Sequence, residues 1–242
     1  QATLDNKGDL GIIFDTDVDR AAIVGSDGRP INKNALIALI SSIILEEHPQ
    51  TTIVTDSVTS NGLAKFIKAR GGIHHRFKRG YKNVINEAIR LNEEGRESHL
   101  AIETSGHAAI KENYFLDDGA YLISKILVKA AKLYRESQDI GQLISDLDEA
   151  LEDKEIRLKI EDKDFRSYAN KLIKSLSEKI KDIDGWAEVA DNYEGIRVDC
   201  YDEKGWFLMR SSLHEPLLVI NFESDIKGGC DTINEKLSAL IK

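Results

Sequence analysis

Residues 10–25, LGIIFDTDVDRAAIVG, place two apolar runs on either side of a charged segment. The runs at 10–14 and 21–24 are rich in β-branched and other apolar residues, as short strands are. The second run is closed by residues 25–30, GSDGRP, a composition typical of turns. We therefore predict two paired strands joined by an acidic loop at residues 15–20.

The acidic loop carries carboxylates at alternate positions, Asp15, Asp17 and Asp19, followed by Arg20. Three such carboxylates can converge on one hard cation, and the guanidinium can hold a phosphate oxygen against it. A solvated acidic turn is the alternative, but crowded like charges cost stability without a counterion. An EF-hand fits less well because Arg20 and Ser26 stand where that motif needs glycine and glutamate. The pattern favours a metal site.

The following part of the chain alternates helical and strand-like segments, which predicts parallel βαβ units and a helix-covered sheet. Asn34 is a candidate cap for the first helix. The expected helices are 35–47, 60–70, 82–92 and 119–134, and the expected strands are 51–55 and 100–102.

A different pattern begins near residue 153. Residues 138–153 are acidic with leucines at four-residue spacing, which predicts a connecting helix. Beyond it, a helix with apolar residues at 165, 168, 172 and 176 and consecutive strands predict an α+β domain on an antiparallel sheet. The expected strands are 156–160, 196–201, 206–209 and 217–222, with a closing helix at 231–241.

The whole is expected to be an α/β protein in three parts. These are residues 1–31, the end of one α/β domain with the acidic loop; 32–152, a complete α/β domain with a parallel or mixed sheet; and 153–242, an α+β domain.

Composition narrows the function classes. Asp and Glu outnumber Lys and Arg by 42 to 33, and the net charge of −9 would repel nucleic acid. Only two cysteines occur, Cys200 and Cys230, without a CxxC pair, which fits a reducing, cytoplasmic compartment. The longest apolar run, 35–45, contains Ser41 and Ser42 and is too short to span a bilayer. Because the chain starts at Gln1 and soon enters a strand-like run, we expect it to be part of something longer.

Residues 103–107, ETSGH, follow a predicted buried strand. Ligands bind at the carboxyl ends of strands in α/β sheets, and a carboxylate with a hydroxyl two residues later can bind neighbouring sugar hydroxyls. Glu103 and Ser105 are therefore candidate sugar ligands. Alone, the segment is equally compatible with a structural turn, and His107 with a surface histidine.

Residues 210–216, RSSLHEP, connect two predicted strands of the last domain. Arg210 and the hydroxyl of Ser212 can donate hydrogen bonds to an oxyanion, as can turn-region backbone amides. The segment is a candidate phosphate site, although Arg and Ser are also ordinary turn residues.

Together the three loops resemble those of the α-D-phosphohexomutases. Residues 15–20 are similar to that family's D-x-D-x-D-R metal loop, 103–107 to its G-E-x-S-G-H sugar loop, and 210–216 to its R-x-S-N-T-E-P phosphate loop, in the same order. The resemblance implies Mg²⁺ as cofactor. It assigns roles to these residues: Asp15, Asp17 and Asp19 as metal ligands; Arg20 at the transferring phosphate; Lys78, Glu103 and Ser105 at the substrate; His107 in proton transfer; Arg210, Ser212 and His214 at the distal phosphate.

The sequence departs from the family pattern in three places. Leu213 and His214 replace the usual Asn-Thr of the phosphate loop, and Ile102 stands where the family usually has glycine. More important, no T-A-S-H-N-P segment occurs, so the phosphorylated serine of the family has no counterpart. The implied function is part of a phosphoglucomutase or phosphomannomutase that interconverts hexose 1-phosphate and hexose 6-phosphate through a phosphoserine and a hexose bisphosphate. The expected partners are these sugars and missing N-terminal domains of the same protein, without which the fragment is expected to be inactive.

Two other functions stay open on the sequence. Residues 12–17 also resemble the start of haloacid-dehalogenase-type phosphatases, with Asp15 as nucleophile, Asp17 as acid/base and Asp117-Asp118 as a later acidic pair. A non-catalytic sugar-phosphate-binding protein would use the same three loops.

Overall fold

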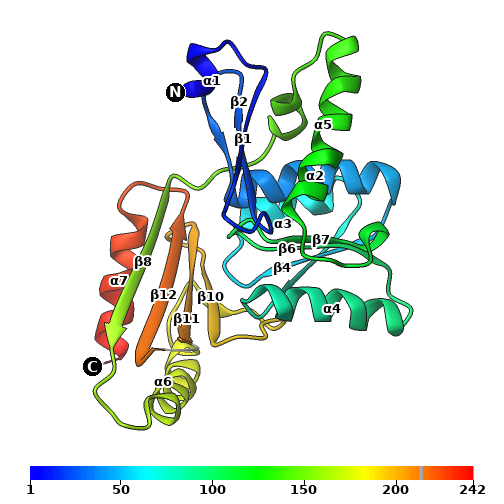
Figure 1. Ribbon diagram of the computed structural model, residues 1–242. Coiled ribbons are helices and arrows are strands. Elements are labelled where there is room, and N and C mark those ends of the chain that lie inside the picture. The colour runs from blue at the N-terminus through cyan, green and yellow to red at the C-terminus, as the bar shows by residue number, and fades with distance from the viewer. Residues whose placement is uncertain (213–214, 242) are drawn as a thin grey trace. The chain divides into compact units, whose positions relative to one another are not determined.

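The structure is a computed structural model that covers residues 1–242 and describes all of them except 213, 214 and 242. It divides into two compact units, an N-terminal unit of residues 1–148 and a C-terminal unit of residues 149–242 (Figure 1). The finer division at residue 31, and the exact limits of the three predicted domains, remain predictions.

The N-terminal unit begins with a β-hairpin that carries the acidic loop at its tip. β1 (Leu10–Phe14) runs antiparallel to β2 (Ala21–Gly25), with Phe14 opposite Ala21, and β3 (Pro30–Ile31) pairs with β2. The predicted pair of strands and the closing turn are confirmed. A short helix, α1 (Ala2–Asp5), precedes the hairpin and was not predicted.

The second sheet of this unit has the order β5-β4-β6-β7. β4 (Thr52–Asp56) pairs in parallel with β5 (Ile73–Phe77) and with β6 (Ser98–Ile102), and β7 (Ala108–Ile110) is antiparallel to β6. The predicted α/β class with a mixed sheet is confirmed. β5 was not predicted because its sequence, IHHRF, is polar in the middle, and β7 is only three residues long.

Helices cover both faces of this sheet (Figure 1). α2 (Lys33–Glu47), α3 (Asn61–Ala69) and α5 (Gly119–Arg135) share a core with Ile53, Leu100 and Ile102, whereas α4 (Tyr81–Glu93) packs on Val54 and Ala101. Successive strand residues point to opposite faces, so these buried strands supply both layers. A 3₁₀ turn, η1 (Lys111–Asn113), leads from β7 toward α5.

The expected cap of α2 is wrong by two residues. The helix begins at Lys33 after Asn32, and the Asn34 side chain instead accepts a hydrogen bond from the backbone N–H of Ser60, 3.2 Å away. Asn34 thus joins α2 to the start of α3.

The expected helix over residues 138–153 is also wrong. The segment forms a 3₁₀ turn, η2 (Ile140–Ile144), and then irregular turns. Tertiary contacts hold it: Arg70 donates to both carboxylate oxygens of Asp146 and to the carbonyl of Leu143. Leu143 and Leu147 still pack on the core. Their four-residue spacing therefore reflects the burial of both side chains and does not indicate a helix.

The C-terminal unit is a five-stranded antiparallel sheet in the order β8-β12-β11-β10-β9. Its helices α6 (Phe165–Ile180) and α7 (Gly229–Leu240) form a core with alternate strand residues such as Phe207, Met209 and Phe222. The predicted antiparallel α+β domain is confirmed. The strands are β8 (Glu152–Lys159), β9 (Trp186–Glu188), β10 (Ile196–Cys200), β11 (Gly205–Ser211) and β12 (Leu217–Ser224).

β8 starts four residues before its predicted position at residue 156. The extension has a structural reason, because the Glu152 carboxylate accepts hydrogen bonds from the backbone N–H groups of Gly228 and Cys230 at the start of α7. β9 was not predicted. Among the described residues, no helix is long and apolar enough to cross a membrane.

Gly62 tests the packing of residues 139–148 on the N-terminal unit. A Cβ at this position of α3 would lie 2.0 Å from the Asp148 carbonyl oxygen. Gly to Ala inside a helix ordinarily stabilises by roughly 0.5–1 kcal/mol, but here we expect Gly62→Ala to destabilise by about 1–3 kcal/mol through overpacking. Urea unfolding measures the effect, with the exposed α3 substitution Lys65→Ala as control. A variant more stable than the parent would show that residues 139–148 do not pack on α3.

Candidate functional site

The acidic loop folds tightly around its own carboxylates. The backbone N–H of Asp15 donates to the Arg20 carbonyl at 3.4 Å, and that of Val18 donates to the Asp15 carbonyl at 3.4 Å. Val18 has φ of +64°, which turns the loop back on itself. One carboxylate oxygen from each of Asp15, Asp17 and Asp19 lies within 4.8 Å of the others. The structure therefore brings the three predicted metal ligands together.

Arg20 partly balances this crowding. Its Nε donates to Asp15 Oδ2 at 2.6 Å, and its backbone N–H donates to Asp15 Oδ1 at 3.2 Å. Although desolvation opposes it, these hydrogen bonds and the positive charge lower the pKa of Asp15. Desolvation, with further repulsion from Asp17 and Asp15, raises the pKa of Asp19. A cation here would relieve the repulsion that Asp19 meets.

The donor set fits Mg²⁺, which prefers carboxylate oxygens. Asp19 Oδ1 is buried and accepts no hydrogen bond from the residues that the structure describes. A buried oxygen left without a donor is costly unless a cation or water satisfies it. Asp15, Asp17 and Asp19 would hold the ion, with Asp17 the most exposed of the three.

Residues 103–107 lie directly against the acidic loop. The backbone N–H of Ala21 donates to the Gly106 carbonyl at 3.4 Å, and Arg20 and His107 form an isolated antiparallel bridge. Gly106 has φ of +101°, and a Cβ on it would lie 2.8 Å from the Ala21 carbonyl oxygen. Glycine is needed at this position for both reasons. The two predicted loops thus form one continuous site.

The substrate candidates Glu103 and Ser105 contact each other and the loop before α4. Glu103 is buried; its Oε1 accepts from the backbone N–H of Gly80 at 2.6 Å, and its Oε2 accepts from Ser105 Oγ at 3.2 Å. Lys78 lies exposed two residues before Gly80. The structure therefore brings Glu103 and Ser105 together and links them through Gly80 to the segment that carries Lys78.

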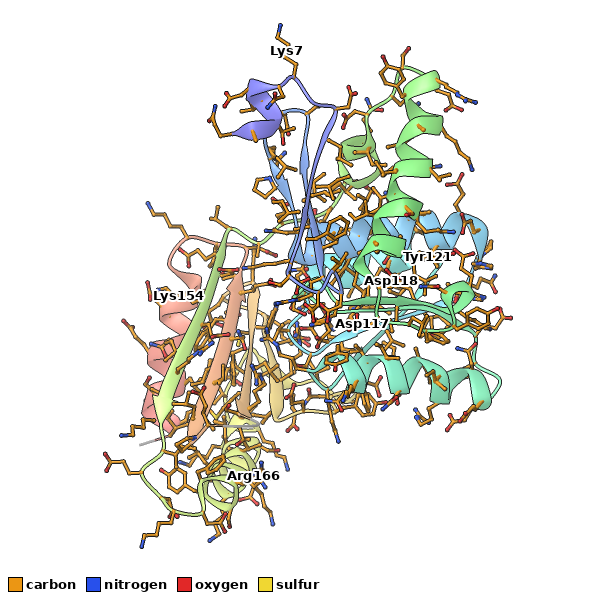
Figure 2. All side chains as sticks on the ribbon, viewed as in Figure 1. Lys7, Asp117, Asp118, Tyr121, Lys154 and Arg166 are labelled. Carbon is orange, nitrogen blue, oxygen red and sulfur yellow. The ribbon has the colours of Figure 1, made fainter. Side chains whose placement is uncertain are left out.

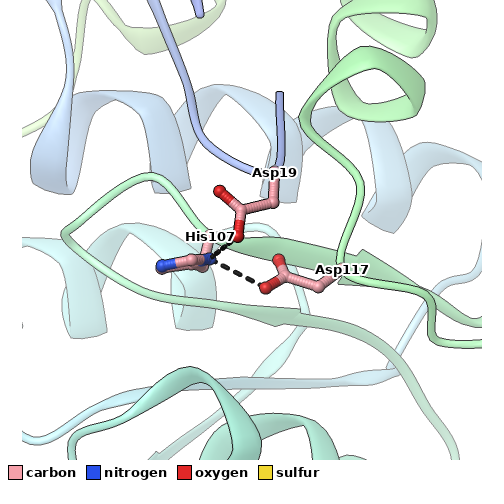
Figure 3. Close-up of side chains that lie close together, drawn as sticks. All are labelled: Asp19, His107 and Asp117. Atoms are coloured by element: carbon pink, nitrogen blue, oxygen red, sulfur yellow. Dashed lines mark hydrogen bonds and ion pairs between the residues drawn. The ribbon is translucent and has the colours of Figure 1, made fainter. Parts of the chain in front are cut away.

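His107 lies between two carboxylates (Figure 3). Its Nδ1 is 2.8 Å from Asp117 Oδ2 and 3.6 Å from Asp19 Oδ2, and its ring stacks on Tyr81 with centroids 4.8 Å apart. Nε2 points away from both carboxylates in Figure 3. The Asp117 contact favours a proton on Nδ1, which leaves Nε2 as the nitrogen able to accept a proton.

Asp117 is the functional candidate that the sequence did not identify as a partner of His107. It lies with Asp118 on the connection that leads into α5 (Figure 2), and burial raises its pKa, with His107 acting in the opposite direction. Asp118 has a different task, because its Oδ1 accepts from the backbone N–H of Tyr121 at the start of α5. Only the adjacency of the two acids was visible in the sequence, and the turn that carries one of them back to His107 was not.

The Arg210 loop belongs to the C-terminal unit. Arg210 lies near the end of β11 opposite Val219, next to Met209, which packs against the helices. By alternation, Arg210 points to the face of the sheet away from α6 and α7. Ser212 Oγ accepts from the backbone N–H of Glu215 at 3.4 Å. His214 and its neighbour Leu213 lie outside the described residues.

The imidazole tautomer of His107 can be measured directly. We expect ¹⁵N NMR of the neutral ring to show the proton mainly on Nδ1, because Asp117 accepts it. In Asp117→Ala this preference should be lost and Nε2–H should become the major form. Tyr81→Phe keeps the stacked ring and serves as control. A parent spectrum dominated by Nε2–H would contradict the assignment.

Comparisons with known proteins show which family and fold the chain shares. The family model "Phosphoglucomutase/phosphomannomutase, alpha/beta/alpha domain III" matches residues 32–150. A phosphoglucomutase from Neisseria gonorrhoeae is 27% identical over 235 residues, covering 97% of this chain and 48% of the relative. The chain therefore spans about half the length of the curated relatives it matches.

Solved structures share the fold. A phosphoglucomutase/phosphomannomutase family protein from Burkholderia thailandensis has a TM-score of 0.80 at 27% identity, covering 100% of this chain and 48% of its own. An Aspergillus fumigatus N-acetylphosphoglucosamine mutase, solved with GlcNAc-6P and magnesium, has a TM-score of 0.61 at 12% identity, covering 95% of this chain and 48% of its own. On the shared fold and the sequence matches, this chain belongs to the α-D-phosphohexomutase family.

Proposed function

We propose that this chain supplies the metal-binding and sugar-binding parts of a phosphohexomutase that interconverts hexose 1-phosphate and hexose 6-phosphate, with glucose or mannose as the sugar. The observation that carries the proposal is the backbone pairing of Arg20 and Ala21 with Gly106 and His107. It brings a three-carboxylate loop and a polyol-binding loop into one site. A hexose phosphate needs both, one for its phosphate and the other for its hydroxyls.

The acidic loop would hold Mg²⁺, which neutralises charge on the transferring phosphoryl group. Arg20 keeps its Nε on Asp15, and the remaining guanidinium nitrogens are candidates to orient a phosphate oxygen. His107 would take a proton from a sugar hydroxyl at Nε2 while Asp117 holds Nδ1. Support comes from the Aspergillus mutase of the same fold, which was solved with a sugar phosphate and magnesium.

Substrate-binding roles are proposed for residues in each unit. Glu103 and Ser105 would bind sugar hydroxyls, and Lys78 a substrate oxygen. Arg210 and Ser212, together with His214, would bind the phosphate that is not being transferred. The carboxylate of Glu103 already accepts two hydrogen bonds, so it is held in position before any sugar binds.

The phosphatase alternative has less support. Its proposed nucleophile, Asp15, is held at both oxygens by Arg20. The acidic pair that this alternative assigns to Asp117 and Asp118 also has other partners, because Asp117 contacts His107 and Asp118 caps α5. A sugar-phosphate-binding protein without catalysis would use the same residues and differs only in turnover.

Turnover requires a phosphoserine that these 242 residues do not match. We propose that it comes from N-terminal domains of the same protein, and that the hexose bisphosphate is the intermediate that accepts and returns the phosphoryl group. With that group absent, the carboxylates and His107 bind and orient substrate but transfer nothing.

We therefore expect the purified chain to show no mutase activity with glucose 1-phosphate or mannose 1-phosphate, with or without Mg²⁺. A coupled assay for the hexose 6-phosphate measures this, and the same chain extended by serine-bearing N-terminal domains should be active. Turnover by the 242-residue chain that Asp17→Asn abolishes would contradict the need for an outside serine. An inactive extended protein that still binds hexose phosphate would favour the non-catalytic alternative.

Binding measurements can separate the proposed roles of Arg210 and Glu103. We expect Arg210→Ala to weaken glucose 6-phosphate binding about tenfold or more, because a charge-assisted hydrogen bond to phosphate is lost. Glu103→Gln, which keeps an acceptor for Gly80, should weaken it less and reduce discrimination between glucose and mannose phosphates. Calorimetry at pH 7.5 measures both, with Arg157→Ala, an exposed arginine of β8 paired with Glu155, as control. Equal affinity of Arg210→Ala and parent would make the Arg210 loop a structural turn.

A further inference from the structure

Asp56 is a buried carboxylate to which the three loops assign no role. It is the last residue of β4, and its side chain is completely buried. Both carboxylate oxygens bind Thr104: Oδ2 accepts from Thr104 Oγ1 at 2.7 Å, and Oδ1 accepts from its backbone N–H at 3.2 Å. Thr104 stands between Glu103 and Ser105. Asp56 thus fixes the residue that separates the two candidate sugar ligands.

A second contact extends from Asp56 to the loop before α4. Arg79 Nε lies 4.0 Å from Asp56 Oδ2. Its neighbour Gly80 donates its backbone N–H to Glu103 Oε1 at 2.6 Å. Residues 78–80 and 103–105 are therefore joined at two points, and one of them is Asp56.

The carboxylate is costly to bury in its charged form. Burial, with added repulsion from Glu103, raises the pKa of Asp56 to about 6, while Thr104 and Arg79 act in the opposite direction. Glu103 and Arg79 are the charged groups that act most strongly on it. A neutral polar side chain could accept a hydrogen bond from Thr104 without the cost of burying a charge. Ionisable groups held at such a cost cluster at functional sites.

We propose that Asp56 is a positioning residue whose ionised carboxylate holds Thr104 and Arg79, and so sets Glu103, Ser105 and Lys78 in the geometry that binds a hexose phosphate. The inference rests on the proposed function of these loops. Protonation removes the attraction to Arg79 and one acceptor from Thr104. The affinity for sugar phosphate therefore depends on a residue that does not touch the sugar.

The binding test compares the parent with Asp56→Asn and with the control Glu87→Gln. Glu87 is also a buried carboxylate of the N-terminal unit, but it binds His75 and Arg90, away from the loops. By NMR titration with glucose 6-phosphate at pH 7.5, Asp56→Asn should bind roughly tenfold more weakly than the parent. At pH 5.2 the difference should shrink to about threefold or less, because the parent carboxylate is then mostly protonated. The phosphate of the ligand ionises in the same way in both titrations. The ratio of the parent's affinity to the variant's affinity therefore reports the ionisation of Asp56.

Three ligand-free readouts keep the test independent of the proposed function. The ¹³C carboxyl shift of Asp56 should titrate near pH 6, and amide exchange at Thr104 should be about tenfold faster in Asp56→Asn than in the parent at pH 7.5. Thermal unfolding at pH 7.5 should show the variant at least as stable as the parent, because it lacks the buried charge. This advantage should be smaller at pH 5.2 and disappear only below the pKa of an unfolded Asp, where the carboxyl is protonated in both states. A less stable, poorly folded variant would thereby be recognised.

The outcomes are distinct. If the parent binds glucose 6-phosphate and Asp56→Asn matches it in affinity and in Thr104 exchange, the positioning role is overturned. If the parent does not bind while Thr104 exchange responds as expected, the hexose-phosphate function of the loops is wrong and the coupling of Asp56 to the loop stands.

Discussion

The site depends on a backbone contact between two segments far apart in the sequence, Ala21 with Gly106 and Arg20 with His107. It joins the hairpin that carries the acidic loop to the edge of the second sheet. Two glycines permit it. Gly106 supplies a positive φ beside the Ala21 carbonyl, and Gly119 lets α5 begin where a Cβ would lie 2.9 Å from the Val18 carbonyl oxygen. Without this contact, His107 would have no fixed position relative to Asp19.

Electrostatics around this contact divides the carboxylates into two kinds. Asp15, Asp117 and Glu103 each have a specific partner in Arg20, His107 or Gly80. The acidic loop as a whole still holds more negative charge than Arg20 balances, and desolvation raises the pKa of Asp19. A cation is the simplest completion of such a cluster, since oxygen ligands already converge there. The fold thus gives Asp15, Asp117 and Glu103 partners within the chain, whereas the remaining negative charge of the acidic loop is what the proposed cation would balance.

Local sequence was enough to predict the hairpin, the acidic loop and the antiparallel sheet of the C-terminal unit. These features follow from short-range rules, namely apolar runs, turn residues and strand periodicity. Local sequence was not enough where tertiary contacts decide. Residues 138–151 form a 3₁₀ turn and irregular turns in place of the predicted helix because Arg70 holds Asp146, and β8 is longer than predicted because Glu152 caps α7.

The contacts of the candidate site also divide into those that local sequence could predict and those that it could not. Convergence of Asp15, Asp17 and Asp19 could be predicted because they lie in one loop. The pairing of His107 with Asp117 and of Thr104 with Asp56 could not, because each depends on how a turn or a neighbouring strand returns to the site. Sheet topology brings the ends of β4 and β6 together, and β5 was not recognised from its polar sequence.

The most direct test of the account is where a divalent cation binds. Mn²⁺ can replace Mg²⁺ at an oxygen site, and its paramagnetism broadens NMR signals of nearby amides. Titrating Mn²⁺ into the ¹⁵N-labelled chain should broaden the amides of residues 15–20 and, across the backbone pairing, those of Gly106 and His107. Asp17→Asn should weaken the effect, and Asp27→Asn, in the turn at the other end of the hairpin, should not. Broadening centred on other acidic residues, or unchanged in Asp17→Asn, would contradict the claim that the acidic loop and residues 103–107 form one metal-dependent site.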